Sequence, residues 1–99
     1  MLALRFTRQA ESDLVSIGTY TLSTWGEAQT DRYLSELELS CRQLAASPLL
    51  GRSCDDVRPG LRRMEHGKHV IFYRIIDGGI LITRILHQSM LPKRHWQEP

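Results

Sequence analysis

The side chains of this sequence that could carry chemistry are cations and imidazoles, and most of them fall in its second half. Cleavage of an RNA phosphodiester needs a general base for the 2′-hydroxyl, an acid for the leaving oxygen, and cations beside the phosphorus. The residues of these types that could converge on one concave face are His66, Lys68, His69, Arg74, Arg84 and His87. If the protein cleaves RNA, we expect Arg84 and His87 to be the catalytic candidates.

The same residues also have structural interpretations. The turn His66-Gly67-Lys68 is typical of a solvated loop, and His87 beside Gln88 is typical of a hydrogen-bonded strand end. Arg74 and Arg84 could grip a phosphate together, or each could pair with a carboxylate of a partner or of the domain itself. The spacing of residues leaves these possibilities open.

The relative placement of the two arginines depends on the register of one predicted hairpin. Asp77-Gly78 is a strong hairpin turn signal. If the turn pairs Ile76 with Ile80, Arg74 lies opposite Ile82 and Phe72 lies opposite Arg84, on the same side of the sheet. The sequence therefore predicts both arginines on one sheet face.

Metal and redox chemistry have little support in the sequence. Cys41 and Cys54 are the only cysteines, and neither belongs to a C-x-x-C pair or to a zinc-type Cys/His spacing. We expect both to be buried as small apolar side chains. We accordingly expect no metal and no organic cofactor.

The length and the charge of the sequence limit the classes of protein to which it can belong. Ninety-nine residues with 41% hydrophobic and 24% charged content predict a single domain over 1–99 with one core. The formal net charge is +2, and the segments Arg58–Arg63 and Arg84–His95 hold most of the excess. A basic carboxy-terminal half indicates an acidic partner, either nucleic acid or an acidic protein segment.

No signal segment opens the chain, and no apolar run approaches the roughly 20 residues that a membrane span requires. We therefore expect a soluble cytoplasmic protein that does not bind a membrane.

The first half of the sequence predicts a short strand and two helices. Residues 2–6 alternate with period two, as in a strand. Thr7 can cap a helix over 8–25, whose apolar residues recur at spacings of three and four, and Gly26 can end it as a left-handed cap. A second periodic stretch over 27–47 stops before Pro48. So short a connection forces the two helices to lie antiparallel.

The second half predicts a loop and a sheet. Residues 48–60 carry loop chemistry, and strands are expected over 61–65, 69–76 and 79–87, before a basic tail over 90–99. The order β-α-α-β-β-β predicts an α+β fold in which the helical hairpin packs on one face of a small, mainly antiparallel sheet. The last two strands are apolar on both faces, so we expect the second face to carry an exposed apolar patch.

Five segments together resemble one family. They are Tyr20 with Trp25-Gly26, then Leu44-Ala45 with Pro48 and Gly51-Arg52, then Arg58-Pro59-Gly60-Leu61-Arg62-Arg63, then Gly67 with His69-Val70-Ile71-Phe72-Tyr73-Arg74, and finally Arg84-Ile85-Leu86-His87-Gln88-Ser89-Met90. On these residues the chain resembles the ParE toxins of the RelE/ParE superfamily over nearly its full length. It departs from the family pattern at Leu91-Pro92, where Asp or Asn is frequent.

The resemblance implies a toxin of a type II toxin–antitoxin pair that inhibits DNA gyrase by protein–protein binding. It also implies a ParD-like antitoxin, bound in a hetero-oligomer, through which any contact with DNA is made. The alternative is a messenger RNA endoribonuclease like the RelE branch of the same fold. That branch uses a site rich in lysine and arginine with a late tyrosine, whereas this chain has only Lys68 and Lys93 and no tyrosine after Tyr73.

Two sets of residues are expected to make the partner contacts. An acidic, amphipathic antitoxin tail would place apolar anchors on the hairpin and carboxylates near arginines, and the residues expected to meet it are Trp25, Leu34, Leu37, Arg74 and Arg84. The residues expected to meet the target are Arg62, Arg63, Arg94, His95 and Trp96. Trp96 could instead fold back over the sheet edge, and Arg58–Arg63 could be a solvated strand edge.

A plain nucleic-acid binder is a further alternative, because the second half is basic. The sequence lacks a basic helix, since Arg8, Arg32 and Arg42 are scattered among acids.

Overall fold

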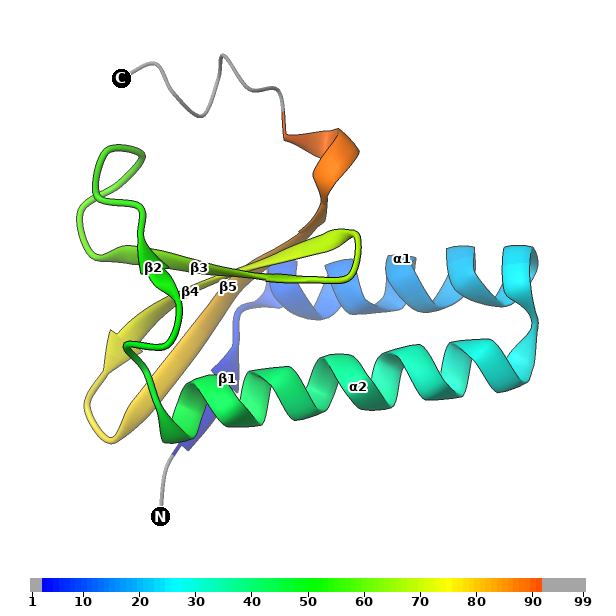
Figure 1. Ribbon diagram of the computed structural model, residues 1–99, viewed down its shortest axis with the longest axis horizontal. Coiled ribbons are helices and arrows are strands. Elements are labelled where there is room, and N and C mark those ends of the chain that lie inside the picture. The colour runs from blue at the N-terminus through cyan, green and yellow to red at the C-terminus, as the bar shows by residue number, and fades with distance from the viewer. Residues whose placement is uncertain (1–2, 92–99) are drawn as a thin grey trace.

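The computed structural model describes residues 3–91, which form one sheet and one helical hairpin (Figure 1). The elements in chain order are β1 (Ala3–Phe6), α1 (Arg8–Trp25), α2 (Glu27–Ala46), β2 (Arg52–Ser53), β3 (Leu61–His66), β4 (His69–Ile76), β5 (Gly79–His87) and the 3₁₀ turn η1 (Gln88–Met90). The predicted α+β class with a hairpin on a mainly antiparallel sheet is confirmed.

The hairpin is connected by a single residue. The Thr7 hydroxyl caps α1 by accepting a hydrogen bond from the Ala10 amide at 3.0 Å. Gly26 ends α1 through its amide, which donates to the Leu22 carbonyl, and its own carbonyl accepts from Thr30 in α2. Its backbone has φ 89° and ψ 176°, so φ is positive as expected but the conformation is not left-handed helical. α2 ends at Ala46, one residue earlier than expected.

The strand order of the sheet is β1-β5-β4-β3-β2. β1 pairs with β5 in parallel, with Ala3 opposite Gly79, and the other pairs are antiparallel. Gly79 has no side chain where a Cβ would meet the Ala3 carbonyl oxygen. The first strand of the chain is thus joined to the last.

The expected register of the β4–β5 hairpin is wrong at its turn. Ile76 pairs with Gly79 across the two-residue turn, so Arg74 lies opposite Leu81 and not Ile82. A register shift between Phe72 and Tyr73 restores Phe72 opposite Arg84. The shift leaves Thr83 of β5 without an opposite residue, so the β5 residues of the main core are Ile80, Ile82 and then Ile85. The expected register assumed strict alternation along β5 and therefore did not include the bulge.

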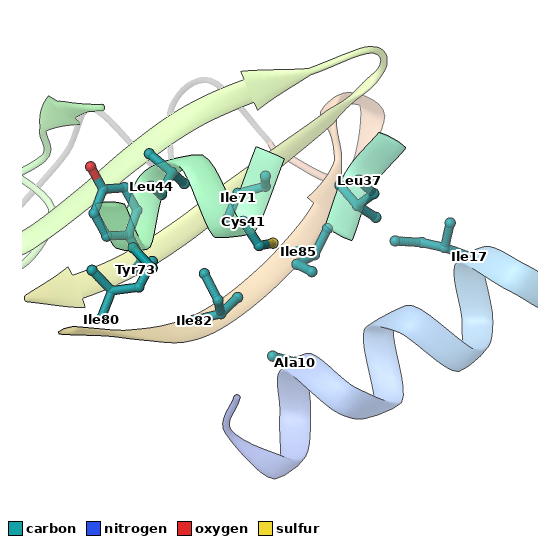
Figure 2. Close-up of a cluster of buried hydrophobic side chains, with 11 residues drawn as sticks. Ala10, Ile17, Leu37, Cys41, Leu44, Ile71, Tyr73, Ile80, Ile82 and Ile85 are labelled. Atoms are coloured by element: carbon teal, nitrogen blue, oxygen red, sulfur yellow. The ribbon is translucent and has the colours of Figure 1, made fainter. Parts of the chain in front are cut away.

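The main core lies between the helical hairpin and the sheet (Figure 2). Buried side chains of both helices meet those of β4 and β5, and they are Ala10, Ile17, Leu37, Cys41, Leu44, Ala45, Ile71, Tyr73, Ile80, Ile82 and Ile85. Cys41 is buried as expected, and this burial raises the pKa of its thiol to about 11. A thiol held protonated in this way is not a nucleophile at neutral pH.

The opposite face of the sheet is also covered, which contradicts the expected exposed apolar patch there. Cys54, Leu61, Val70, Phe72 and Leu86 form a second buried cluster, with Val57 and Leu91 packed against it. The segment between β2 and β3 folds over the sheet, held by hydrogen bonds from the Cys54 amide to the Leu61 carbonyl and from the Gly60 amide to the Asp55 carboxylate. Since this cover has no periodicity, the sequence did not reveal it.

The Tyr73 hydroxyl connects the segment that follows α2 to the sheet through two hydrogen bonds. It donates to the Pro48 carbonyl at 2.6 Å and accepts from the Gly51 amide at 3.0 Å. Gly51 is needed there because a Cβ would come within 2.5 Å of the same hydroxyl.

We predict that Tyr73→Phe lowers the free energy of unfolding by about 1–3 kcal/mol, because it leaves the buried Gly51 amide without its acceptor. Chemical denaturation measures the loss. Tyr20→Phe is the matched control, since Tyr20 is exposed, and it should be close to neutral. Equal stability of the two variants would contradict the assigned role of the Tyr73 hydroxyl.

Candidate functional site

A groove of about 570 Å³ runs along the helical hairpin, bounded by β1, α1 and α2. Its lining is apolar except at one rim, and it consists of Leu4, Phe6, Leu14, Leu34, Leu37, Glu38, Cys41 and Arg42. Glu38 and Arg42 form an exposed ion pair at 2.8 Å along that rim. We call this cavity the helical groove.

An exposed apolar stripe lies on α1. Val15, Leu22 and Trp25 are spaced seven and three residues apart, so they share one side of the helix. Gly18 lies on the same side and faces α2, where Leu34 approaches to 3.6 Å from the position that a Cβ would take. Exposed apolar side chains aligned in this way are the surface that a partner helix or strand can cover.

The residues expected to meet an antitoxin are divided by the structure. Trp25 is 68% exposed, and Leu34 is half-buried at the wall of the helical groove. Leu37 is fully buried in the main core, so a partner could reach it only through a rearrangement of the groove. The apolar stripe on α2 is broad, and periodicity alone does not tell which of its members face the sheet.

Arg84 is held in an internal ion pair. Its guanidinium donates two hydrogen bonds to the Asp13 carboxylate, at 2.9 and 3.0 Å, and this pairing raises the pKa of Arg84. Asp13 also accepts from the Ile85 backbone amide at 2.9 Å. Asp13 therefore ties α1 to the part of β5 that extends past the end of β1. Of the alternatives left open by the sequence, pairing inside the domain is the arrangement that the structure has.

Arg74 is held at a different point, because its Nη1 donates to the Pro59 carbonyl at 2.7 Å. Arg74 and Arg84 nevertheless line one pocket on the face of the sheet away from the helices. The expectation that both arginines share a sheet face thus agrees with the structure, although the register that led to it was wrong.

Arg62 and Arg63 do not form one surface. Arg62 Nη2 donates to the Gly51 carbonyl at 2.6 Å, and its buried Nε has no hydrogen-bond partner within the described part of the chain. Arg63 lies beside Glu65, with Nε 3.5 Å from the carboxylate, and Glu65 also pairs with Arg52 at 2.7 Å. Successive strand residues face opposite sides. The other residues expected to meet the target, Arg94, His95 and Trp96, lie outside the described residues.

Three histidines and a tyrosine gather where β3, β4 and β5 meet α2. Tyr33 Oη lies 2.5 Å from His69 Nδ1 and donates to the His66 carbonyl, and the rings of His69 and His87 pack edge to face with centroids 5.2 Å apart. The His66 Nδ1 lies 2.7 Å from the Ser40 hydroxyl. We call this set the imidazole cluster. The sequence indicated the histidines but not Tyr33, which had only the spacing of a core residue.

Burial lowers the pKa of His69 to about 4, with smaller contributions from His87 and His66. His69 is therefore neutral at neutral pH. It lines, with His87, a pocket of about 350 Å³ against α1, whereas Arg84 lines the pocket on the opposite face. The two candidate nuclease residues, Arg84 and His87, do not converge on one site.

We predict that His69 makes the free energy of unfolding depend on pH. Because the pKa of His69 is about 4 in the folded protein and 6.5 as a free group, its contribution is fully present above pH 6.5 and is lost as pH falls toward 4. The denaturant concentration at the unfolding midpoint should fall for the unmodified protein as the pH is lowered across this interval. It should fall less for His69→Asn, which has no group that titrates there, and an identical fall in both proteins would contradict the prediction.

No cluster of His, Cys, Asp or Glu among residues 3–91 has the arrangement of a metal centre. Neither described helix is apolar enough over its length to span a bilayer.

Comparison with known proteins gives consistent matches. Residues 4–92 match the family described as the ParE toxin of the type II toxin–antitoxin system parDE. The chain is 42% identical over 82 residues to Toxin ParE1 of Mycobacterium tuberculosis (strain CDC 1551 / Oshkosh), covering 82% of this chain and 84% of that one. It is 38% identical over 95 residues to Toxin ParE1 of Caulobacter vibrioides (strain ATCC 19089 / CIP 103742 / CB 15), covering 96% and 98%.

A solved structure has the same fold. A chain of the chromosomal ParDE TA system from P. aeruginosa superposes with a TM-score of 0.73 at 24% identity, covering 88% of this chain and 96% of that chain.

Proposed function

Because the chain belongs to the ParE family of type II toxins, we propose that it inhibits DNA gyrase by protein–protein contact and that a ParD-like antitoxin neutralises it. The observation that carries the antitoxin half of the proposal is the exposed apolar stripe of α1 beside the helical groove. The gyrase half rests on the family.

An amphipathic antitoxin segment fits the surface of the hairpin. Leu22 and Trp25 offer exposed apolar contacts on α1, and Leu34 offers one at the groove wall. The Glu38–Arg42 pair flanks the groove with one charge of each sign. A segment with apolar side chains on one side and polar ones on the other would bury the first set and pair the second.

The edge of β1 offers a second mode of contact next to the groove. The Ala3 amide donates to Gly78 and the Thr7 amide to Ile82, both in the direction of β5. Since alternate residues of a strand direct their backbone groups to opposite sides, Leu4 and Phe6 direct theirs away from the sheet. A partner strand could therefore add to β1 while its side chains enter the groove, which Leu4 and Phe6 also line.

The arginines enter the proposal with different roles. Arg74 remains a candidate to bind an acidic group of the antitoxin. Arg84 has a structural role, because it already pairs with Asp13 inside the domain. For the target we retain Arg63 together with Arg94, His95 and Trp96, and we place Arg62 with the structural contacts because it holds the Gly51 carbonyl. Contact with DNA would come from the antitoxin of the complex, as in the expectation from the sequence.

We predict that the free toxin abolishes supercoiling of relaxed plasmid by purified gyrase in the presence of ATP, and that the antitoxin restores it. A messenger RNA and ribosome cleavage assay run beside it tests the RelE-like alternative. Intact RNA is expected, because Arg84 and His87 line different pockets. Cleaved RNA with unaffected gyrase would overturn the proposal.

We predict that Trp25→Ala weakens antitoxin binding roughly 30-fold, the effect of losing about 2 kcal/mol at an interface hot spot, and that Leu22→Ala weakens it by less. Leu39→Ala is the matched control, because Leu39 is 58% exposed on α2 outside the groove while Leu22 is 52% exposed. Isothermal titration with the purified antitoxin measures the three affinities. Equal antitoxin affinities for the Leu22 and Leu39 variants would show that the exposed apolar stripe of α1 is not part of the interface.

A further inference from the structure

Three arginines surround a pocket on the face of the sheet opposite the main core, and the start of α1 also borders this pocket through Gln9. The pocket has a volume of about 330 Å³, and Arg58, Arg74 and Arg84 line it together with Leu61, Phe72 and Leu86. The last three residues belong to the second buried cluster, so the floor of the pocket is apolar. We call it the arginine pocket.

Two of the three arginines have side chains held by hydrogen bonds of the fold, and the third, Arg58, has its backbone held in a turn. Arg74 donates to the Pro59 carbonyl, and Arg84 is held by Asp13. The backbone of Arg58 is set in a turn, because its amide donates to the Cys54 carbonyl and its carbonyl accepts from the Leu61 amide, each at 3.0 Å. A ligand would therefore meet two guanidinium groups, those of Arg74 and Arg84, that are already positioned, which lowers the entropy lost on binding.

The charge of the pocket is incompletely neutralised. Among residues 3–91, none of those lining it is an acid. Two carboxylates of the surrounding segments have other partners, since Asp13 binds Arg84 and the Ile85 amide, and Asp55 accepts from the Gly60 amide. The guanidiniums of Arg58 and Arg74 thus lie beside apolar surface without a carboxylate of the pocket to pair with.

We infer that the arginine pocket binds an acidic peptide segment, with a carboxylate between Arg58 and Arg74 and a neighbouring apolar side chain on the floor. Charge selects an anion, and the apolar floor selects a ligand with a hydrocarbon part. A nucleic acid fits less well, because Phe72, the one aromatic residue of the lining, is buried and offers no ring for a base to stack on. This site is separate from the helical groove, and the inference holds whether or not gyrase is the target.

The test is a titration of the full chain with three synthetic probes. Binding is monitored through the chemical shifts of the backbone amides. The probes are a peptide that alternates glutamate and leucine, the same peptide with lysine in place of glutamate, and single-stranded oligothymidine. We expect only the glutamate peptide to shift amides of β4, β5 and the Arg58 turn in a saturable way. Absence of such shifts, equal binding of the lysine peptide, or shifts in the pocket from oligothymidine alone would overturn the inference.

Substitutions test which side chains of the arginine pocket bind the glutamate peptide. Arg58→Ala should weaken binding of the glutamate peptide roughly tenfold, the loss expected for one charge-assisted hydrogen bond, and Arg58→Ala with Arg74→Ala should weaken it further. Arg32→Ala, an exposed arginine on α2, is the matched control and should bind as the unmodified protein does. Because Arg58 is exposed and only its backbone holds the turn, the single variant keeps the fold, and unchanged binding in it would contradict the inference.

Discussion

The two central strands of the sheet, β4 and β5, are apolar on both faces, and the rest of the structure depends on how both faces are kept from water. Tyr73 and Ile82 face the helical hairpin, while Phe72 and Leu86 face the other way. The hairpin covers the first face with the inner sides of both helices. The segment from Cys54 to Leu61, a turn with almost no regular structure, covers the second. Because so little chain covers that second face, the arginines at its border remain open to solvent and to a partner.

The contact between Asp13 and β5 holds the hairpin in place at the point where strand pairing stops. β1 ends at Phe6, so from Thr83 onward β5 has a strand beside it only on the β4 side within the described residues. The Thr7 hydroxyl donates to the Thr83 carbonyl, and Asp13 accepts from the Ile85 amide and from Arg84. Side chains of α1 therefore take over the hydrogen bonds that a longer β1 would have made. The same carboxylate fixes Arg84, so the position of the helix and that of a pocket residue are set by one group.

The arrangement of elements was predictable, and most of the site was not. Thr7, Gly26 and the turn Asp77-Gly78 mark their boundaries locally, and the helical spacing of apolar residues is preserved over many turns. The bulge at Thr83 of β5, by contrast, depends on how two strands fit each other, and the cover of the second face depends on a loop with no period. The internal pairing of Arg84 joins residues far apart in the chain, and the choice of its acid required the fold. The imidazole cluster was missed in part because Tyr33 has the spacing of a core residue and bonds through its hydroxyl.

The parallel pairing of β1 with β5 also bears on how the protein is made. Residues 3–6 are synthesised before the rest of the described chain, yet within residues 3–91 their only strand partner is residues 79–82, and Thr7 bonds to Thr83 across 76 positions. The sheet therefore cannot close, nor can α1 dock through Asp13, until nearly all of the described chain has been synthesised. Before that moment the inner sides of α1 and α2 lack the β5 side chains that cover them in the folded domain. A partner that recognises only the closed sheet would find no target on the growing chain, whereas one that binds the hairpin could engage it during translation.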